Sequence, residues 1–137
     1  MKSLAVLVSR GSANHFIQVL TLLMAGVHAE MRLRVLFRDE AVWRLTPERM
    51  NALNLEGALA QDLEATRRRL QKLDLVDLAK LCRDIKASGD VKYYACSSSL
   101  AIYGLSKEHL IPEVDEVRGL PAFLLEDVAA ADRVLTF

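Results

Sequence analysis

The chain has 137 residues, 52% of them hydrophobic and 26% charged, a balance typical of one globular domain and not of a disordered chain. Its 18 lysines and arginines equal its 18 aspartates and glutamates, which argues against binding nucleic acid or an anionic membrane through bulk charge. No segment approaches the roughly 20 apolar residues of a membrane helix, and the two cysteines form no CxxC pair. We therefore expect a cytoplasmic protein without an integral membrane segment, a zinc site or a disulfide framework.

The first part of the chain predicts a strand, a helix and a second strand. Residues 4–8 form a continuous apolar run with valines, which is typical of a strand covered on both faces. Apolar residues then recur at helical spacing over residues 16–27, after Ser12 or Asn14 as a cap. Residues 32–37 predict the second strand.

The middle of the chain is charged and predicts helices. Thr46-Pro47 is a typical helix start, so a short helix is expected from Pro47. Residues 59–73 have a thin line of leucines, with the Arg67-Arg68-Arg69 run on a solvated face. Asp74 is a candidate cap for a further helix ending near Ala87, with Cys82 on its inward side.

The last third alternates again. Residues 91–95 predict a strand that ends at Cys96, residues 97–103 a helix stopped by Gly104, and residues 110–112 a brief extended piece. A helix over residues 119–130 and a strand over residues 132–137 follow. This alternation predicts a single α/β domain over residues 1–137, with a mainly parallel sheet flanked by helices.

Three loops follow strands of this predicted sheet, at the edge where ligands of α/β proteins collect. They are Ser9-Arg10-Gly11-Ser12, Arg38-Asp39 with Trp43 nearby, and Cys96-Ser97-Ser98-Ser99. If the three strands are neighbours, the loops converge.

Cys96 is the candidate reactive residue of these loops. A thiol between a strand and a helix start faces unpaired backbone N–H groups, which stabilise the reactive thiolate. The hydroxyls of Ser97, Ser98 and Ser99 can add hydrogen bonds, and Arg10 and Arg38 can add positive charge. A buried structural cysteine capped by serines remains the alternative, whereas Cys82 is expected to pack in the core.

The other candidate sites are less specific. Ser9, Arg10 and Gly11 form a possible anion cradle, but the chain lacks the GxGxxG and GxxxxGK[ST] patterns, and a plain turn is favoured. The three histidines have no metal-site spacing. A pair between Cys96 and His15 is conceivable, although His15 fits a surface position in the first helical turn.

The string "VKYYACSSSLAIYGLSKEHLIPEVDEVRGLPAFLLEDVAAADRVLTF" resembles the DsrE/DsrF-like sulfur-relay family over about the last 65 residues. It is most similar to the subgroup with a "YAC-small-x-small" loop, a "GL-x-x-E-x-LI" segment and a terminal "LTF"-like strand. The resemblance implies a flavodoxin-like, DsrE-like fold that assembles as a homo-oligomer, a trimer or a hexamer. It also implies that Cys96 accepts sulfane sulfur as a persulfide, and that no metal or organic cofactor is needed.

The partners implied by this resemblance are a TusA-like sulfur carrier and a rhodanese-like donor. Two other functions remain open from the residues themselves. The loops at Ser9–Ser12 and Cys96–Ser99 can belong to a non-catalytic anion- or nucleotide-binding module, in which Cys96 only packs. The chain can also be an inactive structural subunit of an oligomeric relay complex.

Overall fold

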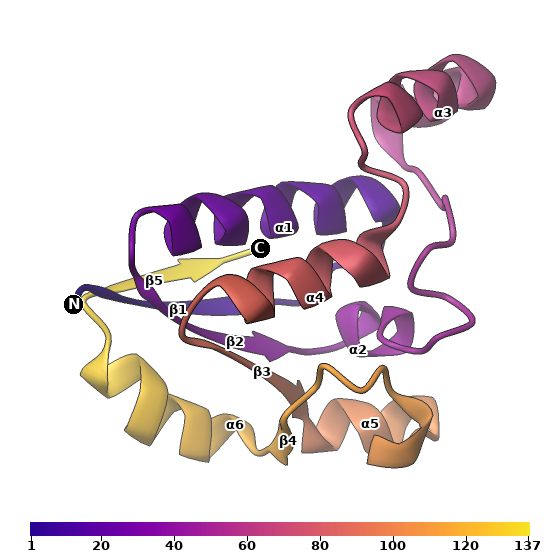
Figure 1. Ribbon diagram of the computed structural model, residues 1–137. Coiled ribbons are helices and arrows are strands. Elements are labelled where there is room, and N and C mark those ends of the chain that lie inside the picture. Colours follow the sequence, from indigo (N-terminus) through magenta and orange to yellow (C-terminus); the bar gives the residue numbers. More distant parts are fainter.

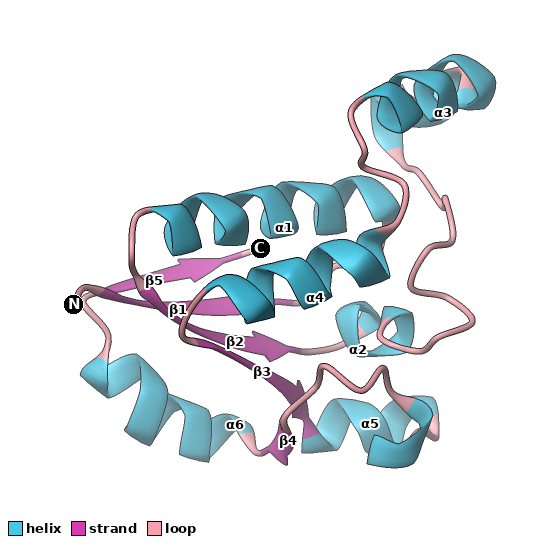
Figure 2. Cartoon of the chain, in the orientation of Figure 1, coloured by secondary structure: helices cyan, strands magenta, loops and turns pink.

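Five parallel strands form the centre of the computed structural model, which describes residues 1–137 (Figure 1). They lie in the order β4-β3-β2-β1-β5. Their bounds are Ser3–Val8 for β1, Arg32–Phe37 for β2, Val91–Cys96 for β3, Glu116–Arg118 for β4 and Arg133–Thr136 for β5. Helices lie on both faces of the sheet (Figure 2), so the predicted α/β class with a parallel, helix-flanked, flavodoxin-like sheet is confirmed.

Two helices, α1 (Ala13–His28) and α4 (Leu78–Ser88), cover one face of the sheet (Figure 1). Their apolar stripes and the sheet enclose the larger of two buried clusters, which has 27 residues. Each helix begins at a side-chain cap: the Ser12 hydroxyl accepts a hydrogen bond from the backbone N–H of His15, and the Asp77 carboxylate accepts one from Lys80.

The opposite face is covered by less of the chain. A helical segment that starts as α6 (Leu120–Ala122) and continues as a π-helical stretch over Phe123–Val128 crosses below the sheet (Figure 1). Five residues form the small buried cluster beneath it: Ala5, Leu36, Tyr94, Cys96 and Phe123. Leu124 and Leu125 of this segment stay exposed, and so does Val134 of β5, the register partner of Ala5.

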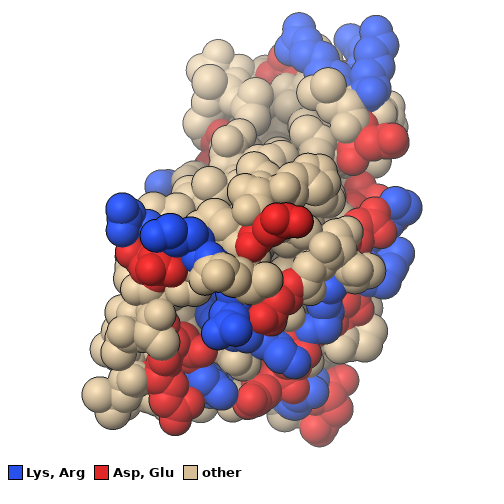
Figure 3. Space-filling view, turned by 60° about the vertical axis from the view of Figure 1, so that its left-hand side comes forward, with Lys and Arg blue, Asp and Glu red and all other residues tan.

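Three further helices lie toward the carboxyl ends of the strands (Figure 1). They are α2 (Glu40–Arg44), α3 (Leu63–Lys72) and α5 (Ser97–Tyr103), with short 3₁₀ turns at Gly57–Gln61 and Lys107–His109. Helix α3 stands away from the body, and basic side chains gather at that end of the molecule (Figure 3). The arginine run of α3 is exposed, as predicted, and no helix has the length and apolarity needed to cross a bilayer.

Several predicted boundaries were wrong, each for a local reason. No helix starts after Thr46, and the region around Pro47 is a turn. The short helix α2 lies before it and ends at Arg44. Helix α4 starts at Leu78, because Asp77 and not Asp74 is its cap: the Asp77 carboxylate accepts a hydrogen bond from the backbone N–H of Lys80. The three-residue strand β4 was missed, and the predicted extended piece at residues 110–112 is loop.

Candidate functional site

Cys96 is the last residue of β3 and directly precedes α5. Side chains alternate along a strand, so Tyr94 and Cys96 share the thinly covered face of the sheet. Cys96 is fully buried there, in the cluster with Phe123. The predicted position of Cys96 at the strand end is confirmed.

Serine side chains and backbone groups of α5 surround the Cys96 sulfur. The Ser98 hydroxyl lies 3.3 Å from Sγ, and Ser99 occupies the same first turn of α5. Burial alone would raise the pKa of this thiol. The hydrogen bonds outweigh burial and lower the pKa of Cys96 to about 7, so a substantial fraction is thiolate at neutral pH.

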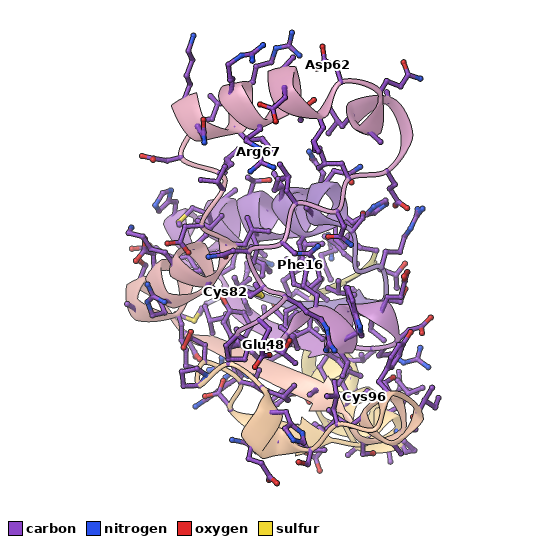
Figure 4. All side chains as sticks on the ribbon, turned by 90° about the vertical axis from the view of Figure 1, so that its right-hand side faces the viewer. Phe16, Glu48, Asp62, Arg67, Cys82 and Cys96 are labelled. Carbon is purple, nitrogen blue, oxygen red and sulfur yellow. The ribbon has the colours of Figure 1, made fainter.

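Cys82 lies on α4, in the large cluster on the opposite face of the sheet (Figure 4). Its exposed fraction is 1%, and burial raises the pKa of its thiol to about 12. Cys82 is therefore a core residue, as predicted. The backbone carbonyl of Cys82 accepts a hydrogen bond from the hydroxyl of Tyr93, 3.0 Å away.

Solvent is close to the Cys96 sulfur although the residue is buried. Ser97 and Ser98 are both exposed, and Ser98 is the residue whose hydroxyl touches the sulfur. A rotation of the Ser98 side chain is therefore a short route to the thiol. The hollows on the surface lie elsewhere, one of them beside the acidic residues Asp77 and Asp84 of α4.

The loop after β2 contacts the Cys96 loop. The backbone N–H of Asp39 donates a hydrogen bond to the Ser99 hydroxyl at 2.9 Å, and the Tyr103 hydroxyl donates one to the Asp39 carboxylate at 2.8 Å. This hydrogen bond to Asp39 raises the pKa of Tyr103 to about 12, so the phenol stays a donor at neutral pH. Asp39 has φ 50° and ψ −133°, a strained conformation for a residue with a side chain.

The loop after β1 does not gather around Cys96, although β1, β2 and β3 are neighbours. Arg10 pairs with Glu56 at 3.2 Å, and the Ser9 hydroxyl donates to the backbone carbonyl of Phe137 at 3.0 Å. Two strand spacings, about 10 Å, separate the ends of β1 and β3. The expectation that all three loops converge was wrong for this one.

Gly11 and Ser12 of the same loop have structural contacts. A Cβ at Gly11 would lie 2.5 Å from the backbone oxygen of Glu40, so only glycine fits against the start of α2. The Ser12 hydroxyl and the Glu56 carboxylate both contact Nδ1 of His15, each at 2.7 Å. His15 is thus held at this loop and not paired with Cys96.

Two arginines flank Cys96 on the same face of the sheet. Arg118 of β4 is its register partner, and Arg38 directly follows the register pair Phe37 and Ala95. Asp127 binds the Arg118 guanidinium at 2.6 Å. Nε of Arg38 is buried without a hydrogen-bond partner.

The sequence reasoning missed Asp39, Tyr103 and Arg118. The four-residue spacing of Ser99 and Tyr103 places both on one face of α5. The sequence therefore contained a signal that Tyr103 lies near the serine cluster. Aspartate is also among the residues that tolerate positive φ, but the contact between Asp39 and Ser99 spans 60 residues and carries no local signal.

No family model matches the chain, and no curated protein does. Among solved structures, the chain is similar to the protein of unknown function MTH1491 from Methanobacterium thermoautotrophicum, with a TM-score of 0.63 and 12% sequence identity. The match covers 98% of this chain and 99% of the other. At this identity the likeness shows a shared fold over the whole chain.

Proposed function

We propose that this protein carries sulfane sulfur as a persulfide on Cys96 and passes it to a partner protein. The observation that carries the proposal is the position of the Cys96 sulfur, at a strand end, 3.3 Å from the hydroxyl of an exposed serine. Hydrogen-bond donors at this position stabilise a thiolate.

The reaction needs only thiolates and persulfides. The Cys96 thiolate attacks the outer sulfur of a donor persulfide, R–S–SH, and a new S–S bond forms while the S–S bond of the donor breaks. The donor leaves as a thiolate, and the proton stays on the outer sulfur. The thiolate of an acceptor then attacks the outer sulfur of the Cys96 persulfide, and Cys96 is released as thiolate. Neither step has a net oxidation, so no metal or organic cofactor is required.

The residues around Cys96 suit this chemistry. Ser98 and Ser99 donate hydrogen bonds to the attacking thiolate, and the same donors serve the thiolate that returns when sulfur leaves. Ile102 is 79% exposed one helical turn after Ser98, so a partner that reaches the sulfur rests on an apolar side chain. By the sequence resemblance, this partner is a TusA-like carrier or a rhodanese-like donor.

We propose further that the protein forms a homo-oligomer and is located in the cytoplasm. Leu124, Leu125 and Val134 leave apolar surface exposed at the thinly covered face, which suits a homo-oligomer of trimer or hexamer type. Two free thiols fit a reducing compartment, the cytoplasm.

A binding function of the Ser9–Ser12 turn has less support. Glu56 already pairs with Arg10 and contacts Ser12 and His15, so a carboxylate stands where an anionic ligand would bind. If Cys96 takes up no sulfur from a persulfide donor, the alternative is that the chain is an inactive subunit of a relay complex.

Persulfide loading tests the proposal directly. The reduced protein is incubated with a small-molecule persulfide, and each cysteine peptide is examined by mass spectrometry. We expect a mass increase of one sulfur atom on the Cys96 peptide, no loading in Cys96→Ser, and normal loading in the control Cys82→Ala. Loading on Cys82, or equal loading of wild type and Cys96→Ser, would contradict the proposal.

A further inference from the structure

We propose that Asp39 and Tyr103 are positioning residues for the Cys96 thiol and that they act through Ser99. Neither residue touches the sulfur. Hydrogen bonds join them to Ser99, from the Tyr103 hydroxyl to the Asp39 carboxylate and from the Asp39 backbone N–H to the Ser99 hydroxyl, and Ser99 lies in the first turn of α5, three residues after Cys96. The inference rests on the proposed role of Cys96, because it concerns the reactivity of the same thiol.

The backbone of Asp39 is held in a conformation that it would not adopt alone. Its φ of 50° and ψ of −133° belong to a region populated almost entirely by glycine, and such strain persists only where neighbouring contacts impose it. Asp39 also stands at the N-cap of α2, where an aspartate normally caps the helix, yet its side chain makes no cap hydrogen bond. Its carboxylate accepts the Tyr103 hydroxyl instead.

This conformation sets the direction of the Asp39 peptide N–H, which points at the Ser99 oxygen from 2.9 Å. A serine hydroxyl that accepts a hydrogen bond from this N–H keeps its own proton free to donate. Ser99 is 5% exposed, so water does not compete for that proton, and Ser99 contributes to the lowered pKa of Cys96. The Tyr103–Asp39 contact therefore keeps the Ser99 hydroxyl in place with its proton free for the nearby thiolate.

Other charged and titratable groups also face Cys96. Arg38 and Arg118 flank it on β2 and β4, Tyr94 lies two residues before it on β3, and Asp127 of the π-helical stretch binds Arg118. None of them is hydrogen-bonded to Asp39, Ser99 or Tyr103. The hydrogen-bonded route from Tyr103 toward the thiol therefore runs through Asp39 and Ser99.

A double-mutant cycle on the full chain tests this path. The pH profile of iodoacetamide labelling is measured at the Cys96 peptide for wild type, Ser99→Ala, Tyr103→Phe and the double variant. We expect Ser99→Ala to raise the thiol pKa by about one unit, which lowers the thiolate fraction at pH 7 about fivefold. Tyr103→Phe should raise it by about half a unit in wild type and leave it unchanged in the Ser99→Ala background.

Each possible outcome decides the point. Equal effects of Tyr103→Phe in both backgrounds, or no effect in wild type, would overturn the inference, and so would a lower thermal midpoint without a shift of the pH profile. Tyr94→Phe is the matched control and should leave the profile unchanged. Labelling with iodoacetamide does not depend on sulfur transfer. If the four proteins show the expected pKa values but the wild type takes up no persulfide, the proposed function is wrong and the role of Asp39 and Tyr103 still holds.

Discussion

Cys96 and Cys82 are both buried free thiols, yet the pKa is lowered to about 7 for one and raised to about 12 for the other. Burial opposes ionisation of both side chains. The difference has two causes. Cys82 lies deep in the large cluster, where burial is the main cause of its raised pKa, whereas the sulfur of Cys96 lies against the hydroxyl of the exposed Ser98 at the start of α5. Depth of burial and hydrogen-bond donors therefore together decide which thiol can react.

Replacing Ser98 with alanine should change the reactivity of Cys96 in two opposite ways. Loss of the hydroxyl removes a donor to the thiolate and raises the pKa of Cys96 from near 7 by about one unit. Loss of the Oγ atom also uncovers the sulfur, so the alkylation rate at high pH should exceed that of wild type.

The full pH profile of alkylation separates these two effects. The midpoint reports the pKa of Cys96, and the plateau reports access to the sulfur. Cys82 should stay unlabelled throughout in the folded protein and is an internal control, because its pKa is raised to about 12 by burial. A midpoint that does not move in Ser98→Ala would show that this hydroxyl does not act on the thiolate.

At the scale of the elements, α2 is linked to the loops around it by one arginine. Its Arg44 is fully buried and has no carboxylate partner. Nε donates to the carbonyl of Gly11, and Nη1 donates to the carbonyls of Arg49, Met50 and Ala52 at 3.0–3.1 Å. One side chain thus joins the loop after β1 to the segment that follows α2, and burial lowers its pKa to about 10.

Arg44→Lys should destabilise the protein by about 3 kcal/mol, because an ammonium group cannot span carbonyls that a planar guanidinium reaches together. The free energy of unfolding is measured by urea denaturation. Arg49→Lys is the control: Arg49 is half-buried and has one hydrogen bond, to the carbonyl of Trp43, so its loss should be under about 1 kcal/mol. Similar losses in the two variants would show that the carbonyl contacts of Arg44 contribute little.

At the scale of the whole molecule, the two faces of the sheet are covered unequally. One face is closed by α1 and α4, and the other leaves apolar side chains exposed beside the π-helical stretch and β5. Leu125 is 77% exposed in this area. Exposed apolar areas of this kind are typical of protein–protein contacts.

We therefore expect the protein to be a homo-oligomer in solution, and Leu125→Asp to dissociate it. The mass is measured by size-exclusion chromatography with light scattering. Ile102→Asp is the matched control, since Ile102 is equally exposed but lies on α5, and its mass should equal that of wild type. A monomeric wild type would contradict the expectation.

The sequence predicted the parts of the fold that depend on local pattern. Strands β1, β2 and β3 are continuous apolar runs, and the position of Cys96 follows directly from the end of one of them. The exposed three-residue strand β4 has no such pattern, because pairing with β3 alone creates it. The contact of Asp39 with Ser99 was equally invisible, since it arises when β2 and β3 become neighbours.

The placement of the two cysteines on opposite faces of the sheet also has a kinetic consequence. The sheet separates Cys96 from Cys82, so no second thiol of the same chain can attack a persulfide or a sulfenic acid at Cys96. If Cys96 carries sulfur as proposed, its release would then be bimolecular. The lifetime of the loaded protein would depend on the concentration of an acceptor thiol, and Cys82 would offer no route to discharge.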